Sequence, residues 1–323
     1  MSWGNVAPAT TAPPASVAGI TYNEDYYRNR FLTVRAQSVP VRMSLVGREN
    51  TAKTGTALSM CDPNKKTVIF DVDNSAQATV EHIYGDNPNI VVIPLHDETD
   101  DSIFHDDNTV NYVALIDKVN WYINILAQEI AEKPDEYGAI IMDGMSSYLK
   151  WCEHAMTHWL MTRSKNPVNV EDGEKFNQAE WRVRNKIYRD TMSRVHGLPV
   201  ERVFYTFHLK EEKQFADDGT GKKVLMTVGE RPEWDKGTMR YFSQQLFLTR
   251  YTKKGDRAAG VKVDKNLSDN EWVIKASIEE MKGKNMEHLG TTHTILSVKD
   301  GNVKWAGLPF LKWGDESVVN NEN

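Results

Sequence analysis

The sequence has little cysteine and no long hydrophobic run. Only Cys61 and Cys152 occur among 323 residues, too few for a disulfide framework and without the Cys-x-x-Cys spacing of a zinc site. No run of roughly eighteen apolar residues is present, and the first residues lack the basic start and apolar block of an export signal. We therefore expect a protein without a membrane span or redox chemistry, located in the cytoplasm, which is the host's if the chain is viral.

The sequence also lacks a net positive charge. The formal net charge is -6, so no overall basic field draws the protein onto nucleic acid, and any contact with DNA must be local. Acidic residues gather from His96 to Asp107, a stretch without regular ligand spacing that is typical of a solvated loop rather than a divalent-ion site. Basic residues gather in four other stretches, at 182–194, 210–223, 231–240 and 250–265.

The apolar content of 40% is enough for the buried core of one large α/β domain, alone or with a modest appendage. Residues 1–20 are rich in Ala, Pro and Thr with almost no charge, which is typical of a disordered arm. We expect a folded core at 21–252 and a C-terminal extension with a β-hairpin at 253–323.

Short apolar segments alternate with longer amphipathic ones along this core. The expected strands cover residues 41–46, 67–71, 89–94, 138–143 and 202–208. The expected helices cover residues 110–131, 146–162 and 178–196. This alternation predicts an α/β fold with a mostly parallel central sheet flanked by helices on both faces. Turn sequences at 217–221 and 299–302 predict that the C-terminal third adds antiparallel strands.

The segment from Gly47 to Thr54 has the spacing of a Walker A phosphate loop, except that Ala52 replaces the second glycine. An expected strand precedes it and an expected helix follows, which is the context in which backbone N–H groups surround phosphates. Lys53 is then placed to reach the β- and γ-phosphate oxygens, and Thr54 to bind Mg²⁺. If Ala52 must adopt a positive φ, its Cβ costs roughly 1 kcal/mol without abolishing binding. An ordinary loop is the alternative. The expected nucleotide-binding residues are Gly47, Arg48, Glu49, Asn50, Thr51, Ala52, Lys53, Thr54 and Gly55.

Acidic residues and a histidine end three of the expected strands. Asp143 is the expected second holder of the metal, directly or through water, with capping of the next helix as the alternative. Asp71 and Asp73 are both candidates to polarise the attacking water, and turn capping is their alternative. His208 would face the γ-phosphate as a sensor unless it is an ordinary structural residue.

The order of these elements resembles the RecA superfamily, and more closely the phage RecA-like nucleotide-binding proteins that assist single-strand annealing. The resemblance covers roughly residues 41–252 and is carried by four blocks: Gly47–Thr54, Val68–Asp73, Ala139–Gly144, and Glu180-Trp181-Arg182 followed by Val203–Lys210. It implies a RecA-like P-loop core that binds ATP and Mg²⁺. It gives water activation to Asp73, where RecA has Glu, and γ-phosphate sensing to His208, where RecA has Gln. The Walker roles fall on Lys53, Thr54 and Asp143.

The resemblance also implies partners. RecA-like ATPases often complete their site with a cation from the next protomer, and Lys236 and Arg240 are the candidates. Family DNA-binding loops correspond to 163–176 and 210–231, where Phe215 adds a stacking ring that suits single strands, and a solvated hairpin is the alternative. The expected DNA contacts are Arg163, Lys165, Lys210, Lys213, Lys222 and Lys223.

The sequence therefore predicts a RecA-like ATPase that forms a homo-oligomeric ring or filament and acts on single-stranded DNA in phage-type recombination or annealing. A single-strand-binding protein is a further expected partner. Two alternatives remain open: a recombination mediator that is switched by nucleotide with little hydrolysis, and a P-loop motor of the DNA-packaging type.

Overall fold

The computed structural model describes residues 40–163, 176–217, 223–281 and 286–308. The chain divides into two compact units, Met1–Val39 and Pro40–Asn323, and every described residue belongs to the second. The arm expected at residues 1–20 lies outside the described residues, as do Lys165 and Lys222.

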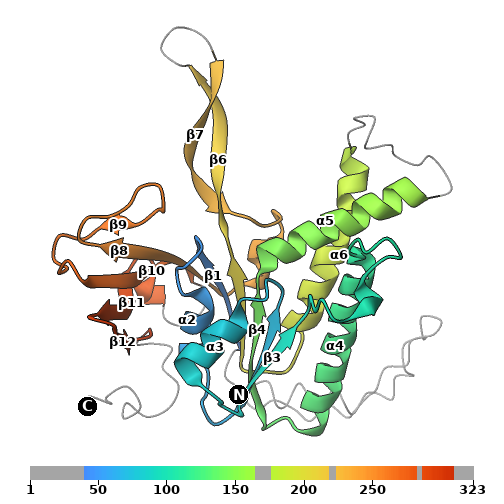
Figure 1. Ribbon diagram of the computed structural model, residues 1–323, viewed down its shortest axis with the longest axis horizontal. Helices are drawn as coiled ribbons and strands as arrows, with labels where there is room; N and C mark the ends of the chain where they lie inside the picture. Colours follow the sequence, from blue (N-terminus) through green and yellow to red (C-terminus); the bar gives the residue numbers. More distant parts are fainter. Residues whose placement is uncertain (1–39, 164–175, 218–222, 282–285, 309–323) are drawn as a thin grey trace, which may run out of the picture. The chain divides into compact units, whose positions relative to one another are not determined.

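A ten-stranded sheet forms the centre of the second unit (Figure 1). Its order is β12-β11-β10-β8-β1-β5-β4-β2-β3, with β9 paired to β8. The parallel strands are β1 (Val41–Gly47), β2 (Lys66–Asp71), β3 (Ile90–Pro94), β4 (Tyr137–Asp143), β5 (Arg202–Phe207), β8 (Gln244–Thr252) and β9 (Lys262–Val263). The antiparallel strands are β10 (Glu271–Met281), β11 (Thr292–Lys299) and β12 (Asn302–Trp305). The predicted fold class is confirmed, and the C-terminal strands continue the same sheet through the β8–β10 pair.

Helices cover both faces of the sheet. One face carries α4 (Tyr112–Glu132), α5 (Met145–Thr162) and α6 (Gln178–His196), and the other carries α2 (Lys53–Ser59) and α3 (Ala76–Tyr84). Short 3₁₀ turns lie at η1 (Asp101–Ile103), η2 (Thr238–Tyr241) and η3 (Met286–His288). Of these helices, α3 is one that the sequence analysis did not name. No helix within the described ranges is long and apolar enough to cross a membrane.

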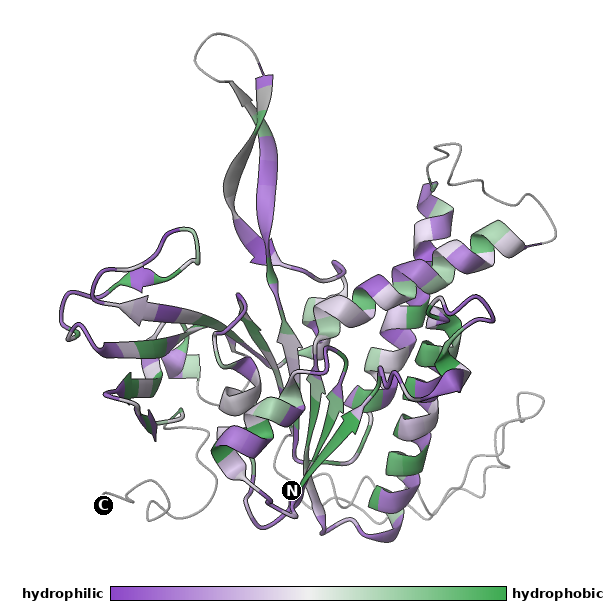
Figure 2. Ribbon diagram, in the orientation of Figure 1, coloured by the Kyte–Doolittle hydropathy of each residue, from purple (hydrophilic) through white to green (hydrophobic). Residues whose placement is uncertain are grey.

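The central strands feed two separate hydrophobic cores because successive side chains of a strand point to opposite faces. In β4, Ile140 and Met142 enter the core beneath α4, α5 and α6, whereas Ala139 and Ile141 enter the core beneath α2 and α3. All residues of β4 are buried, as expected for a parallel strand covered on both faces. The strands at the centre of the sheet are accordingly hydrophobic along their length, and the outer helix faces are mixed or hydrophilic (Figure 2).

Two strands lie outside this sheet. β6 (Leu209–Asp217) and β7 (Lys223–Pro232) pair antiparallel as a separate ribbon that projects from the body (Figure 1). We call residues 209–232 the hairpin. A single residue, His208, separates the end of β5 from the start of β6. The other predicted hairpin is confirmed by the β11–β12 pair, in which Lys299 lies opposite Asn302.

Candidate active site

The loop between β1 and α2 has the backbone that a phosphate loop requires. Asn50 and Ala52 have φ angles of 58° and 54°, in the left-handed region where a Cβ is unfavourable. The expected positive φ at Ala52 is therefore present, at a cost of roughly 1 kcal/mol. At Gly47 a Cβ would lie 2.8 Å from the carbonyl oxygen of Leu248, so only glycine fits between the loop and β8.

Lys53 begins α2 and is buried. Its Nζ donates to the carbonyl oxygens of Gly47, at 3.3 Å, and Arg48, at 2.9 Å. Burial lowers the pKa of Lys53, and the negative charges of Asp143, Asp73 and Glu49 partly oppose that effect. The site thus holds a buried cation whose hydrogen bonds go to loop carbonyls.

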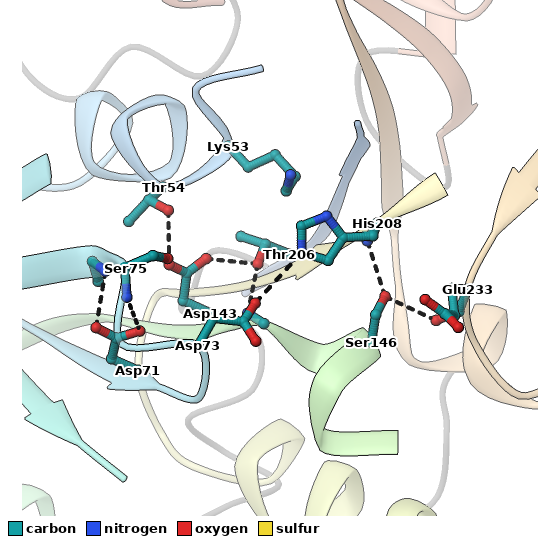
Figure 3. Close-up of polar contacts among 12 residues, drawn as sticks. Lys53, Thr54, Asp71, Asp73, Ser75, Asp143, Ser146, Thr206, His208 and Glu233 are labelled. Atoms are coloured by element: carbon teal, nitrogen blue, oxygen red, sulfur yellow. Dashed lines mark hydrogen bonds and ion pairs between the residues drawn. The ribbon is translucent and has the colours of Figure 1, made fainter. Parts of the chain in front are cut away.

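Asp143 ends β4 and meets two hydroxyl groups (Figure 3). Thr54 Oγ1 donates to Oδ2 at 2.7 Å, and Thr206 Oγ1 donates to Oδ1 at 2.6 Å. Asp143 is 3% exposed, and burial raises its pKa against the opposing effects of both hydroxyls and of Lys53. The helix-capping alternative is wrong, because Gly144 stands at the N-cap of α5 with no side-chain cap.

The two candidate water-activating aspartates have different roles. Asp71 accepts hydrogen bonds from the backbone of Ser75, at 3.1 Å, and Ala76, at 2.8 Å, where α3 begins, so its capping alternative is what the structure shows. Asp73 instead faces His208, with 3.4 Å between Asp73 Oδ2 and His208 Nε2. Burial tends to raise the pKa of Asp73, but hydrogen bonds from His208 and Ser147, with the charges of His208 and Lys53, outweigh it and lower the pKa.

Two hydroxyl residues that sequence reasoning missed organise this group. Thr206 accepts from Gly144 N at 2.8 Å while it donates to Asp143. Ser146 Oγ accepts from His208 N at 2.9 Å and donates to the Glu233 carbonyl at 3.0 Å (Figure 3). Thr206 lies one residue inside the strand that ends before His208, and its hydroxyl group between two aromatic residues of a buried strand was the available signal.

Lys236 and Arg240 are the candidate shared cations. Both are exposed, near η2, and Arg240 donates to Tyr241 Oη at 3.0 Å. Within the ranges that the structure describes, neither makes a hydrogen bond or ion pair with Lys53, Asp73 or Asp143.

The expected DNA contacts are divided between two places. Lys210, Lys213 and Lys223 lie on the hairpin, where Lys213 pairs with Glu211 at 3.2 Å. Arg163 follows α5 and pairs with Glu180 at 3.0 Å.

The comparison with known families agrees with this geometry. The sequence pattern of the AAA domain matches residues 39–246, well over half of the chain. The chain belongs to the AAA domain family. Membership supports nucleotide binding and ATP hydrolysis by this P-loop ATPase domain, whose matched region contains the phosphate loop, Asp73, Asp143 and His208.

Other comparisons add two facts. The chain is similar to "a prototypical ATPase from the type III secretion system of pathogenic bacteria", with 11% identity and a TM-score of 0.37 over 65% of this chain and 52% of that one. This chain therefore spans about half the length of that protein. No curated protein matches the sequence.

Proposed function

We propose that the chain is a RecA-like, Mg²⁺-dependent ATPase of the phage type that forms a homo-oligomeric ring or filament and acts on single-stranded DNA in recombination or annealing. The observation that carries the ATPase part is the meeting of Lys53, Thr54, Asp73, Asp143 and His208 at one edge of the sheet (Figure 3). A single-strand-binding protein is a further proposed partner.

The residues of the loop fit a nucleotide. Lys53 is a buried cation whose hydrogen bonds, among the residues that the structure describes, go to carbonyl oxygens, so its charge is available to phosphate oxygens. The remaining residues from Gly47 to Gly55 would contribute backbone N–H groups and shape. Bound ATP would supply the γ-phosphoryl group that is transferred to water, leaving ADP.

The hydroxyl and carboxylate of Thr54 and Asp143 fit Mg²⁺. Both are oxygen donors of the kind this cation prefers, and they already lie 2.7 Å apart. Asp143 carries a buried negative charge whose observed bonds come from neutral hydroxyl groups, so a divalent cation would offset the cost of that burial. When bound, the cation would neutralise charge on the phosphates.

Asp73 is the proposed group that orients the attacking water, and His208 the proposed γ-phosphate sensor. Its lowered pKa keeps Asp73 ionised at neutral pH, as a hydrogen-bond acceptor for water must be. Because His208 contacts Asp73 and directly precedes β6, the sensor would lie between the catalytic carboxylate and the hairpin. We propose that Lys236 or Arg240 of a neighbouring copy supplies the cation with which RecA-like ATPases complete their site.

The hairpin is the proposed DNA-binding element. Phe215 and Leu225 lie opposite each other and are 74% and 55% exposed, and Lys213 and Lys223 are nearby. An isolated two-stranded ribbon is at best marginally stable in water, which supports a role in contact with a partner. Aromatic stacking and phosphate neutralisation suit a single strand.

Single-turnover ATP hydrolysis, with and without single-stranded DNA, tests the enzymatic part. Lys53→Ala is expected to lose nucleotide binding, and Asp73→Asn to keep binding while hydrolysis falls on the order of 100-fold. DNA-stimulated phosphate release supports the proposal. Tight binding without turnover supports the mediator, a reading favoured by the strained Ala52, and stimulation by duplex with translocation supports a motor.

Oligonucleotide binding across a salt series tests the DNA part. Phe215→Ala is expected to weaken binding by about 1–3 kcal/mol with an unchanged salt slope, because it removes stacking. Replacing Lys213 and Lys223 with Met should lower the slope by about 0.7 for each lysine that contacts phosphate. Trp121→Ala, at a 57% exposed aromatic on α4, is the matched control and should leave binding unchanged. An equal loss from Trp121→Ala and Phe215→Ala would exclude the hairpin.

A further inference from the structure

One side chain of the phosphate loop runs away from the site to the root of the hairpin. Arg48 Nε and Nη2 each lie 2.5 Å from Glu230 Oε1, and Arg48 Nη1 donates to the Ala258 carbonyl at 2.9 Å. Glu230 lies on β7, two residues before the end of that strand, and Ala258 lies in the loop after β8. Arg48 therefore joins three segments that are distant in sequence.

The turn at residues 256–261 passes close to the Arg48 side chain because it has glycine at position 260. Gly260 has a φ of 68°, and a Cβ there would overlap Cδ and Nε of Arg48. The close approach of the 256–261 turn to the guanidinium is therefore possible only with glycine.

The ion pair fixes position more than it stabilises the fold. The side chains of Arg48 and Glu230 are 33% and 34% exposed, and ion pairs at this exposure contribute little to stability because water and salt screen them. A guanidinium has planar, fixed N–H directions, so donating to a carboxylate and a carbonyl together sets its orientation.

The main chain of the same residue belongs to the site. The Arg48 carbonyl accepts from Lys53 Nζ at 2.9 Å. Lys53 has three N–H donors, and each one that turns toward a phosphate is lost to the carbonyls of Gly47 and Arg48. The main chain of Arg48 thus contacts Lys53 in the nucleotide site, and its guanidinium contacts Glu230 on the hairpin.

We propose that the Arg48–Glu230 ion pair couples nucleotide binding to the hairpin, with Glu230 as a positioning residue for the phosphate loop. The coupling rests on the proposed function, since it needs Lys53 to meet phosphate. Reorientation of the Arg48 peptide moves the guanidinium and, through Glu230, the root of β7. If bound nucleotide changes the affinity of the hairpin for a ligand by some factor, thermodynamic linkage requires that this ligand changes the affinity for nucleotide by the same factor.

This route is separate from the one through His208. His208 precedes β6 and contacts Asp73, so it reaches the first strand of the hairpin from the hydrolytic side. Glu230 lies on the second strand and reaches the loop that cradles phosphate. The two strands can therefore report on different features of the bound nucleotide.

Amide hydrogen exchange on the full chain tests the coupling. A non-hydrolysable ATP analogue with Mg²⁺ is added, and exchange is followed in peptides covering 209–217 and 223–232. In the wild type, bound analogue is expected to change exchange in both peptides. In Glu230→Gln, the analogue should bind within about threefold of wild-type affinity, since the pair is exposed, while the change in 223–232 is lost.

Two further variants separate coupling from general damage. Glu136→Gln breaks the Lys66–Glu136 pair, which lies at the start of β2 and just before β4, and should respond like the wild type. Glu230→Asp keeps the carboxylate and should recover part of the response. Circular dichroism melting checks that each variant is folded.

The outcomes distinguish this inference from the function on which it rests. A wild-type chain that binds no analogue rejects the proposed function. A chain that binds analogue, but whose 223–232 exchange changes equally in the wild type and Glu230→Gln, overturns the coupling and leaves the ATPase proposal standing. A hairpin that never responds to bound analogue overturns it as well.

Discussion

At the residue scale, Ala52 combines a left-handed backbone conformation with a side chain that disfavours it. Its φ of 54° is the conformation that a glycine adopts without cost, while its Cβ makes the same conformation unfavourable. The loop nevertheless continues into α2, since Ala52 O accepts from Thr56 N at 2.8 Å. Packing around the loop therefore outweighs a local strain of roughly 1 kcal/mol.

Ala52→Gly is expected to stabilise the protein by up to about 1 kcal/mol, because relief of the left-handed strain exceeds the extra entropy of glycine in the unfolded chain. Urea denaturation measures the change. Ala131→Gly, at an exposed helical position of α4, is the control and should lower stability instead. A loss of stability in both variants would show that Ala52 is not strained.

Asp143→Asn is expected to separate stability from activity. Burial raises the pKa of Asp143, so the folded protein favours the protonated carboxyl, and the charged form weakens the fold above its ordinary pKa of 3.8. The variant should therefore be more stable without nucleotide by on the order of 1 kcal/mol at neutral pH, and lose Mg²⁺-dependent hydrolysis.

The stability gain expected for Asp143→Asn depends on pH, because the burial penalty applies only to the ionised carboxylate of Asp143. The stability gain of Asp143→Asn should grow as pH rises from 3.8 through the raised pKa and shrink as pH falls toward 3.8. Denaturant unfolding at a series of pH values measures it. A gain that is constant with pH would mean that Asp143 carries no burial penalty.

At the element scale, the start of α6 is closed by a capping box. Asn177 Oδ1 accepts from the backbone of Ala179 and Glu180, at 2.9 and 3.0 Å, and Glu180 Oε2 accepts from Asn177 N at 2.9 Å. Glu180 was one of the residues on which the RecA resemblance depended, and here it both caps the helix and holds Arg163.

Asn177→Ala should cost about 1 kcal/mol, because two backbone N–H groups at the helix start lose their side-chain acceptor. Thermal unfolding followed by circular dichroism measures the loss. Gln178→Ala, at the next exposed position, should change stability by less than about 0.5 kcal/mol. Equal effects of the two substitutions would show that the cap does not contribute.

At the scale of the whole molecule, the C-terminal strands contribute to the hydrophobic core that packs against α2, the helix after the phosphate loop. Ile274, Ile278 and Leu296 pack in the same core as Leu58 of α2. A Cβ at Gly55 would lie 2.8 Å from the Trp305 ring, so β12 directly covers the helix that carries Lys53 and Thr54. The strands beyond residue 252 therefore support the nucleotide site, although they lie outside the matched family region.

A mixing experiment tests whether neighbouring copies share a site. Lys53→Ala and Arg240→Ala are each expected to be inactive alone, because one lacks the phosphate lysine and the other the cation given to its neighbour. An equal mixture should recover about a quarter of wild-type hydrolysis, since random assembly pairs an intact Lys53 with an intact Arg240 at that frequency. No recovery for this pair, nor with Lys236→Ala in place of Arg240→Ala, would exclude both residues as shared cations.

The sequence by itself determined the parallel strands, the long helices and the phosphate loop, because each depends on periodicity or spacing within a short segment. It also brought Lys53, Thr54, Asp73, Asp143 and His208 into consideration, since they follow apolar strands whose ends meet at one edge of the sheet. The resemblance favoured Asp73 over Asp71, but only the tertiary structure showed that Asp71 accepts from the start of α3 while Asp73 faces His208, because this depends on the direction in which the chain turns after β2. The same holds for Thr206, Ser146 and the Arg48–Glu230 pair. Their roles arise from contacts between segments distant in sequence, which no local pattern encodes.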